Sequence, residues 1–252
     1  MAEEKECKFD FEGVFNPEDY MYFYGDELTE DRTDREVEFL IDELGMYKPM
    51  SILDVGCGFG RHAIKLAEKG HRVTGIDCME GFLCLARDQA QEKNLKINFI
   101  NKDMRYVEFN GEFERAILMF TTFGYFTDDQ NLKVLKNISR ALDGHGLFCF
   151  DTFNRDAFLK DFIPYFVHEK NEDFMIDRFN FDPKTGHLIN SRIIVRDGKR
   201  KDTPFVIRLY DYNEIERLLG EAGMEIEKIY GDWSKSPFTK DSRGMKIIAK
   251  KI

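Results

Sequence analysis

The chain has 252 residues, 42% of them hydrophobic and 14% aromatic, which is enough to bury one large core and does not favour a fusion of two enzymes. Its 37 basic and 47 acidic residues give a net charge of -10, which argues against generic binding to nucleic-acid backbones and anionic membranes. No apolar run reaches the ~18 residues of a membrane span, and residues 1–7 lack the pattern of a secretory signal, so we expect a cytoplasmic protein.

Apolar spacing up to residue 151 predicts helices that alternate with strands. The predicted helices are residues 31–44, 61–69, 80–94 and 128–142, and the predicted strands are residues 52–55, 72–77, 97–102, 115–120 and 146–151. Asp31 or Thr33 is expected to cap the first helix and Gly45 to end it. Such alternation predicts an α/β fold built on a doubly wound, Rossmann-like parallel sheet.

The alternation stops after the fifth strand. Three extended runs, at 174–181, 188–195 and 205–210, are joined by turn sequences and predict an antiparallel meander. A helix near 215–222 and strands near 225–230 and 245–250 then complete the chain. We therefore predict an N-terminal helical cap segment at 1–50, a Rossmann-like domain at 51–153 and 209–252, and an antiparallel β lid or substrate insertion at 154–208.

Cysteines and histidines form no metal-binding or disulfide pattern. The cysteines are odd in number and include no Cys-x-x-Cys pair, so we interpret them as reduced, small apolar side chains: Cys7, Cys57, Cys78, Cys84 and Cys149. The five histidines are scattered without a spacing such as His-x3-His. No metal is therefore expected.

The stretch SILDVGCGFG (residues 51–60) places three glycines between a strand and a helix, where a nucleotide-type cofactor can lie against the backbone. Dinucleotide enzymes use Gly-x-Gly-x-x-Gly to hold a pyrophosphate, whereas here the spacing is Gly-x-Gly-x-Gly and Asp54 stands two residues before Gly56. A carboxylate repels a pyrophosphate but attracts the sulfonium and ammonium groups of S-adenosylmethionine. Asp77, at the end of the next strand, can accept hydrogen bonds from both ribose hydroxyls. These residues favour a methyl donor over a nicotinamide cofactor.

At these residues the chain resembles the class I S-adenosylmethionine-dependent methyltransferases, over about residues 20–252. LDVGCGFG (53–60) is similar to their first motif, GID (75–77) to their ribose-binding acid, KDMR (102–105) to their adenine-contacting segment and RAILMF (115–120) to their fourth strand. TTFGYF (121–126) and DWSKSPF (232–238) resemble a subset of small bacterial and archaeal members. The resemblance implies a seven-stranded, mostly parallel sheet with a reversed hairpin edge, S-adenosylmethionine as cofactor and S-adenosylhomocysteine as product.

The resemblance also implies which residues contact the cofactor. Asp103 is expected to accept a hydrogen bond from the adenine amine, and Met104 to offer its backbone N–H and its thioether to the ring. Five further residues are expected to contact the cofactor because they lie within or beside these motifs: Cys57, Gly58, Cys78, Met79 and Phe120.

Three tyrosines before the first predicted helix and two arginines within it have both a functional and a purely structural interpretation. One of Tyr20, Tyr22 and Tyr24, with Tyr24 as the candidate, is expected to cover the cofactor or the acceptor, although core packing also explains the three rings. Arg32 or Arg35 could bind the methionine carboxylate, or simply pair with acidic neighbours on a solvated helix face.

Methyl transfer from a sulfonium is a direct displacement, so orientation and desolvation can supply much of the catalysis without a dedicated base. If the acceptor has a proton to remove, the candidates are Tyr125 after the fourth strand and Asp151 at the end of the fifth. An aromatic packing role for Tyr125 and a helix cap at Asp151 are the alternatives.

These observations favour a methyltransferase that acts on a nitrogen or oxygen nucleophile of a small molecule. The alternatives are an RNA or protein methyltransferase, a non-catalytic S-adenosylmethionine sensor and a nicotinamide-dependent oxidoreductase. The sequence TTFG (121–124) stands where base-amine methyltransferases resemble Asp/Asn-Pro-Pro-Tyr/Phe, which argues against a nucleic-acid substrate. Asp54 and the glycine spacing argue against the oxidoreductase.

Overall fold

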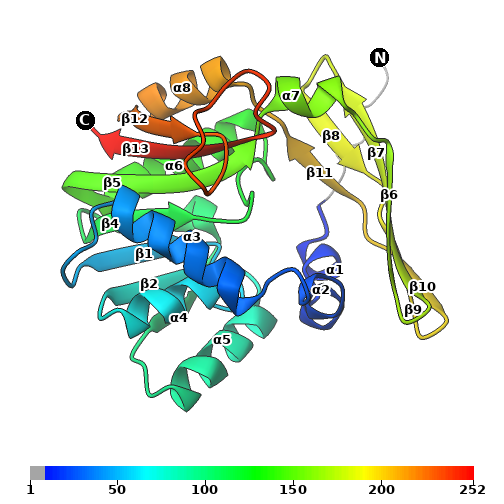
Figure 1. Ribbon diagram of the computed structural model, residues 1–252, viewed down its shortest axis with the longest axis horizontal. Helices are drawn as coiled ribbons and strands as arrows, with labels where there is room; N and C mark the ends of the chain where they lie inside the picture. The colour runs from blue at the N-terminus through cyan, green and yellow to red at the C-terminus, as the bar shows by residue number, and fades with distance from the viewer. Residues whose placement is uncertain (1–8) are drawn as a thin grey trace.

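The computed structural model describes residues 9–252 and contains two β-sheets (Figure 1). The larger sheet has seven strands in the order β12-β13-β5-β4-β1-β2-β3. Strands β1 to β5 run parallel, and β13 pairs antiparallel with both β5 and β12. This confirms the predicted Rossmann-like sheet with a reversed edge. Its strands are β1 Ser51–Val55, β2 Arg72–Asp77, β3 Asn98–Asn101, β4 Phe113–Leu118, β5 Leu142–Phe153, β12 Met224–Tyr230 and β13 Gly244–Lys251.

Helices cover both faces of this sheet, because apolar side chains alternate between the two sides of buried parallel strands. One core cluster joins the sheet to α6 and α8, and a second joins its other face to α3 and α4. The flanking helices are α3 Glu30–Glu43, α4 Arg61–Glu68, α5 Glu80–Glu92, α6 Asp128–Ala141 and α8 Tyr212–Glu221. The predicted cap of α3 is wrong: Thr29 precedes the helix, and its Oγ1 accepts a hydrogen bond from Arg32 N at 3.2 Å.

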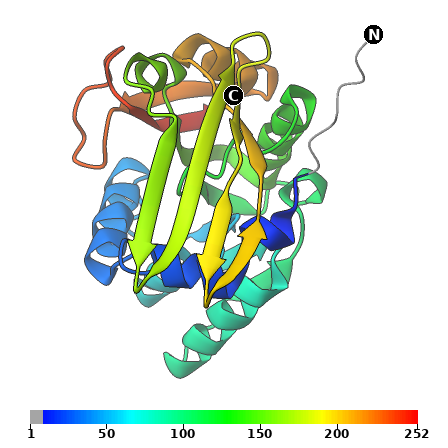
Figure 2. The ribbon, with the colours of Figure 1, turned by 90° about the vertical axis from the view of Figure 1, so that its right-hand side faces the viewer.

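The second sheet, which we call the lid, stands beside the first and is antiparallel throughout, as predicted (Figure 2). The predicted meander is confirmed: β8 and β9, the two halves of the run 188–195, both pair with β7 on one side, and they pair with β11 and β10 on the other. The predicted run 188–195 breaks at Ser191 and Arg192, where the Arg192 side chain turns inward to Asp177. The lid strands are β6 Tyr165–Lys170, β7 Asp173–Asp182, β8 His187–Asn190, β9 Ile193–Arg196, β10 Lys199–Asp202 and β11 Phe205–Arg208.

Two short N-terminal helices, α1 Phe11–Val14 and α2 Pro17–Tyr24, lie between the lid and the large sheet (Figures 1 and 2). Asp19 of α2 pairs with Arg196 of the lid at 3.0 Å. On the opposite side of α2, the Tyr20 ring meets Phe82 of α5 with ring centroids 5.2 Å apart. The tyrosines expected just before the first helix are therefore part of a helix, which joins the two sheets.

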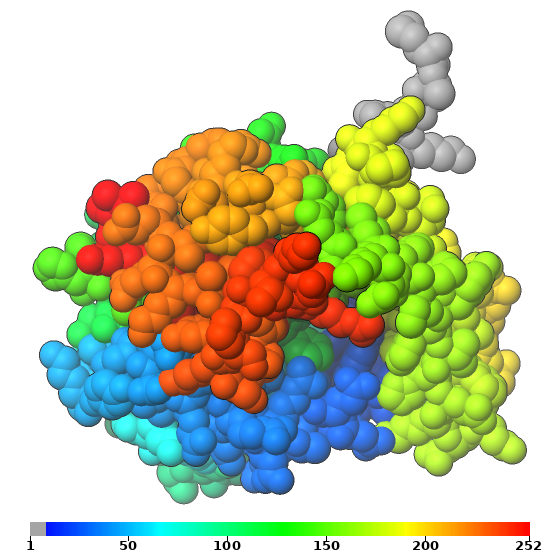
Figure 3. Space-filling view, turned by 45° about the horizontal axis from the view of Figure 1, so that its top comes forward, coloured from blue at the N-terminus to red at the C-terminus, as the bar shows by residue number. Residues whose placement is uncertain are grey.

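The loop between β12 and β13 ties the lid base to the body and covers the junction seen in Figure 3. Lys235 of this loop pairs with Glu43 of α3 at 2.7 Å. Asn154, just before α7 Arg155–Lys160, donates hydrogen bonds from Nδ2 to the carbonyl oxygens of Lys240 and Ser242 at 3.2 and 3.0 Å. Within residues 9–252, no helix is long and apolar enough to cross a membrane.

Candidate functional site

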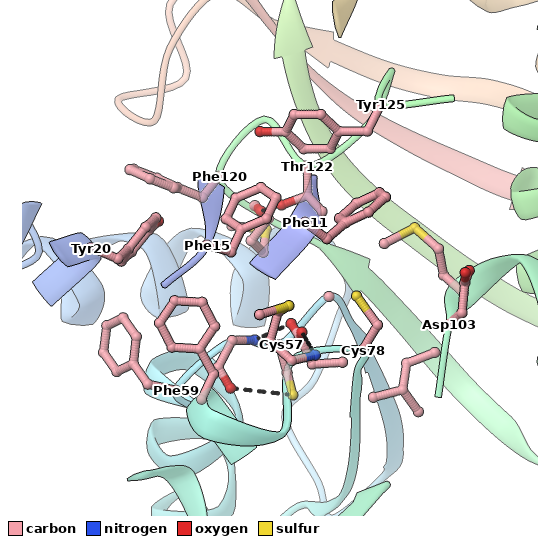
Figure 4. Close-up of a pocket in the computed structure, with 18 of the residues that line it drawn as sticks. Phe11, Phe15, Tyr20, Cys57, Phe59, Cys78, Asp103, Phe120, Thr122 and Tyr125 are labelled. Carbon is pink, nitrogen blue, oxygen red and sulfur yellow. Dashed lines mark hydrogen bonds between the residues drawn. The ribbon is translucent and has the colours of Figure 1, made fainter. Parts of the chain in front are cut away.

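The glycine turn between β1 and α4 forms the floor of a cleft at the carboxyl edge of the large sheet, which we call the glycine cleft (Figure 4). Gly56 and Gly58 have φ of 64° and 55°, in the left-handed region that side chains other than glycine disfavour. A Cβ on Gly56 would lie 2.8 Å from Thr122 Cγ2, so the turn packs tightly against the loop after β4. A Cβ on Gly58 would meet nothing within 4 Å, which leaves its backbone open to a ligand.

Asp77, at the end of β2, is held by backbone donors at the side of the glycine cleft. Its Oδ2 accepts from Gly58 N and its Oδ1 from Met79 N, both at 2.8 Å. Burial raises the pKa of this carboxyl, although the two amides oppose the shift. Each oxygen keeps a free lone pair, so the geometry suits a pair of hydroxyl donors.

Two buried polar atoms of opposite character near the glycine turn have no hydrogen-bond partner, although only the second belongs to a residue that lines the glycine cleft. They are Oδ2 of Asp54 and Nη2 of Arg61. Burial raises the pKa of Asp54 to about 7, opposed by the Arg61 charge and reinforced by Asp77. Orphaned buried groups are costly unless a ligand completes them. An unpartnered acceptor before the glycine turn and an unpartnered donor after it suit the ammonium and carboxylate of an amino acid moiety.

Arg61 is oriented by a buried ionic cluster around Glu36. Glu36 receives Arg32 Nε at 3.0 Å, Arg61 Nη1 at 2.5 Å and His62 Nε2 at 2.9 Å. Burial opposes ionisation of Glu36, but the His62 hydrogen bond and the Arg61 charge lower its pKa to about 2. Burial and the Arg61 charge lower the pKa of His62 to about 4, so the pair is a carboxylate and a neutral imidazole.

Arg32 and Arg61 both contact Glu36, but they differ in whether they face the glycine cleft. Arg32, the residue predicted for the methionine carboxylate, is paired with Glu36 and does not line the glycine cleft. Arg61 lines the cleft and keeps a free Nη2. The sequence carried a signal for it, because a cation in the first turn of a helix is unfavourable unless it has a partner. The assignment of Arg32 stays a prediction that no observation tests, and Arg61 is better placed.

At the far end of the glycine cleft lie Cys78, Met79, Asp103 and Met104, as the sequence placed them. Asp103 is already paired with Arg105, whose Nη2 lies 2.6 Å from Oδ2. Burial and the nearby Asp77 charge raise the pKa of the Cys78 thiol to about 12, so this cysteine is neutral and not a nucleophile. The mixture of thiol, thioether and one carboxylate suits a flat ring with an amine at its edge.

A second cavity of about 410 Å³ opens between the large sheet, α2 and the lid, and we call it the aromatic chamber. Half of the residues that line it are Phe or Tyr. Tyr24, predicted for the cofactor, lies here and not in the glycine cleft. Five residues line both spaces and so mark where they meet: Phe15, Tyr20, Phe120, Thr122 and Tyr125.

The loop after β4 shapes this boundary. Phe120 and Thr121 have φ of 66° and 52°, a strained conformation for two consecutive non-glycine residues. Asp151 accepts a hydrogen bond from Thr121 N at 3.1 Å and is itself buried. It lines neither space, so it acts on the loop and not on a ligand. Figure 4 shows Tyr125, Thr122, Phe120 and Phe15 above the glycine turn.

In residues 9–252, no group of three or more His, Cys, Asp or Glu side chains is arranged to hold a metal ion. Cys57 and Cys149 are buried free cysteines and Cys84 is an exposed one, whereas Cys78 is exposed as a residue although its thiol is largely enclosed in the glycine cleft; Cys7 lies outside the described residues. The site therefore offers hydrogen-bond donors, carboxylates and rings. Such a site can position two molecules edge to edge.

Comparison with known proteins shows that the chain is similar to methyltransferases. Residues 52–146 match the family model of a methyltransferase domain. The chain is 25% identical over 245 residues to a putative methyltransferase of Geobacillus sp. strain WCH70, covering 93% of this chain and 99% of that one. A solved S-adenosylmethionine-dependent methyltransferase from Clostridium acetobutylicum ATCC 824 shares the fold, with a TM-score of 0.80 and 20% identity over 93% of this chain and 96% of that one.

A further solved structure carries the donor itself. This amino pentose methyltransferase from Micromonospora echinaspora, solved with S-adenosylmethionine bound, matches with a TM-score of 0.69 and 16% identity, covering 92% of this chain and 96% of that one. The comparisons together confirm the predicted resemblance to methyltransferases and the fold.

Proposed function

We propose that this chain, which belongs to the class I S-adenosylmethionine-dependent methyltransferases, methylates a nitrogen or oxygen nucleophile of a small molecule held in the aromatic chamber. The observation that carries the proposal is the set of residues common to the chamber and the glycine cleft. A donor in one space and an acceptor in the other would meet at that boundary. Proximity and orientation there can supply a large part of the rate enhancement.

The proposed cofactor contacts set the direction in which the methyl group points. Asp77 would hold the ribose, Asp103 and Met104 the adenine, and the two orphaned atoms of Asp54 and Arg61 the methionine end. When bound, the cofactor would supply an electrophilic methyl group: the acceptor's lone pair would form the new bond to carbon, the electron pair of the broken C–S bond would stay on sulfur, and the acceptor's proton would pass to water. Residues at the boundary exclude other nucleophiles from the site.

The two residues predicted as possible bases fit other roles better. Burial raises the pKa of the Tyr125 phenol, which therefore stays protonated and donates a hydrogen bond near neutral pH. Asp151 supports the Thr121 amide without lining either space. We therefore propose that Tyr125 orients the acceptor, that Asp151 is a positioning residue, and that no side chain acts as a dedicated base.

Release of S-adenosylhomocysteine tests the proposal. Purified protein is incubated with S-adenosylmethionine and, separately, with the small-molecule, RNA and protein fractions of a cell extract. Turnover confined to the small-molecule fraction is expected. Turnover with only RNA or protein would support a macromolecular methyltransferase, and binding of the donor without turnover in any fraction would support a sensor.

Two variants control this assay. Asp77→Ala should lose turnover because the ribose contact is removed. Asp88→Ala changes the same residue type at an exposed position of α5 and should keep it. Equal turnover of the two variants would contradict the assignment of the glycine cleft to the cofactor.

A further inference from the structure

The polar groups of the aromatic chamber are already partnered within the protein, which limits what the chamber can accept. Arg192 and Asp177 form a buried ion pair, with Nε 2.7 Å from Oδ1. Asn190 Nδ2 donates to the same Oδ1 at 2.6 Å, and Arg192 Nη2 donates to the Tyr24 hydroxyl oxygen at 2.8 Å. The second pair, Arg243 and Asp161, is looser at 3.7 Å, and its side chains are 75% and 66% exposed. The buried charges of the chamber, Arg192 and Asp177, therefore neutralise each other, whereas the Arg243–Asp161 pair is solvated at the surface.

The hydroxyls of the chamber are also mostly used. Thr121 Oγ1 donates to the Phe120 carbonyl at 2.8 Å, and Thr122 Oγ1 to the Met119 carbonyl at 2.7 Å. The phenols of Tyr20 and Tyr125 remain as donors at the boundary with the glycine cleft. Burial raises the pKa of both, so they carry their protons. Together with the Tyr24 hydroxyl, which accepts from Arg192 and still has its proton to donate, they can satisfy about three acceptor atoms of a ligand.

Three classes of acceptor fit this chamber poorly. A polyhydroxylated sugar would bury several hydroxyls without partners. An anion would meet no unpaired cation and would lose its hydration without compensation. A cation would find the buried carboxylate of Asp177 already paired with Arg192, whose guanidinium also covers Phe205 at 4.9 Å and Tyr24 at 5.8 Å. A ring without charge avoids all three costs and gains from burial against Phe and Tyr.

We infer that the aromatic chamber takes an uncharged aromatic or heteroaromatic acceptor, whose nucleophilic nitrogen or oxygen lies at one edge of the ring and points to Tyr20 and Tyr125. This inference rests on the proposed function for the direction of the nucleophile. The expected preference for uncharged rings depends only on the residues that line the chamber and not on the proposed function. At about 410 Å³, it lies in the size range of small-molecule sites.

Binding of three probes to the protein saturated with S-adenosylhomocysteine tests the class without requiring turnover. The probes are 2-naphthol, 2-naphthoate and methyl glucopyranoside: a neutral ring, the same ring with a negative charge, and a neutral polyol. Calorimetry at pH 7 should show 2-naphthol binding at least ~10-fold tighter than either of the others. Equal or tighter binding of the naphthoate or the glucoside would overturn the inference, as would no binding of 2-naphthol.

Adjacent residues of β6 provide a matched pair of variants. Phe166 and Val167 are 53% and 54% exposed, so either should tolerate a charge without unfolding. Phe166 lines the chamber and pairs with Asp177, whereas Val167 pairs with Ile176 on the opposite face of the lid and does not line it. Phe166→Asp should weaken 2-naphthol binding at least ~10-fold while Val167→Asp leaves it within ~2-fold. Equal effects of the two variants would place the ring outside the chamber and contradict the inference.

The outcomes also separate this inference from the proposed function. If 2-naphthol binds as expected but no extract fraction supports release of S-adenosylhomocysteine, the methyltransferase proposal fails and the class of chamber ligand stands. If turnover is found only with sugars or ionic acceptors, the proposed function stands and the inferred acceptor class fails.

Discussion

Replacing Asp54 with Asn should stabilise the cofactor-free protein and weaken cofactor binding at the same time. Asp54 is 1% exposed, and its Oδ2 has no partner within the described part of the chain. A charge in that position lacks solvation until a ligand ammonium neutralises it. Asp54→Asn keeps the shape of the side chain and removes the charge, so its effects report on the charge.

The magnitude follows from the pKa. Burial raises the pKa of Asp54 to about 7, whereas an aspartate in an unfolded chain titrates near ~3.9. Because the folded state holds the proton more tightly, the free energy of unfolding falls as the pH rises from about 4 to about 7. At 1.36 kcal/mol for each pH unit in this window, the full cost above pH 7 is up to about 4 kcal/mol. About 3 kcal/mol of it accumulates between pH 5 and pH 8.

Urea unfolding of the cofactor-free wild type and Asp54→Asn at pH 5 and pH 8 measures this difference. The stability advantage of the variant should grow by about 3 kcal/mol between the two pH values. Calorimetry with S-adenosylhomocysteine at pH 8 should show that the same variant binds about 10- to 100-fold more weakly, because a charge-assisted hydrogen bond to the ammonium is lost. Asp88→Asn, on the exposed face of α5, should change neither quantity.

Two results would refute the reasoning in different places. Parallel stability curves for wild type and Asp54→Asn would mean that Asp54 is not a buried charge in the cofactor-free protein. Unchanged binding together with the expected stability curves would mean that the charge exists but does not contact the ligand ammonium.

The remaining predictions concern the other walls of the glycine cleft. Asp77→Ala should weaken S-adenosylhomocysteine binding by ~1–3 kcal/mol, measured by calorimetry, because two ribose hydroxyls lose their acceptor; an unchanged dissociation constant would contradict the ribose assignment. Gly58→Val should abolish binding, since its side chain would enter open space in the cleft and φ of 55° would add strain of ~1–3 kcal/mol; normal binding would show that the turn is only structural. Arg61→Gln should weaken binding at least ~10-fold and Arg32→Gln less than ~3-fold; the reverse order would restore Arg32 as the carboxylate ligand.

The sequence predicted the large sheet and the position of the glycine turn because both follow from local patterns, whereas Asp54, Arg32 and Tyr24, which were also predicted to contact the cofactor, do not line the glycine cleft. Asp54, Gly58 and Asp77 lie at the ends of two adjacent parallel strands, and parallel strands bring their carboxyl ends to one edge. Strand order was implied by the family resemblance and by the alternation of helices and strands. Only the three-dimensional structure shows which polar atoms are buried without a hydrogen-bond partner, as Asp54 Oδ2 is.

The lid was harder to predict because its strands do not share one pattern. Residues 165–170 form an edge strand whose side chains are mostly exposed on both faces, so no apolar alternation marks β6. The break at Ser191 and Arg192 depends on a buried ion pair with Asp177, a residue in another strand. Contacts of this kind are set by tertiary structure and leave no local signal.

The boundary between the two spaces is the part of the site that sequence analysis could describe least and that determines the chemistry most. Phe15, Tyr20 and Thr122 come from α1–α2 and from the loop after β4, segments far apart in the chain. Thr122 packs against Gly56 so closely that a Cβ there would lie 2.8 Å from its methyl group, and Asp151 fixes the preceding residue through its amide. The turn that holds the donor and the loop that faces the acceptor are thus one packed unit. A ligand that orders the glycine turn therefore also orders the wall against which the acceptor lies, so the donor and the acceptor should each tighten the binding of the other by the same factor.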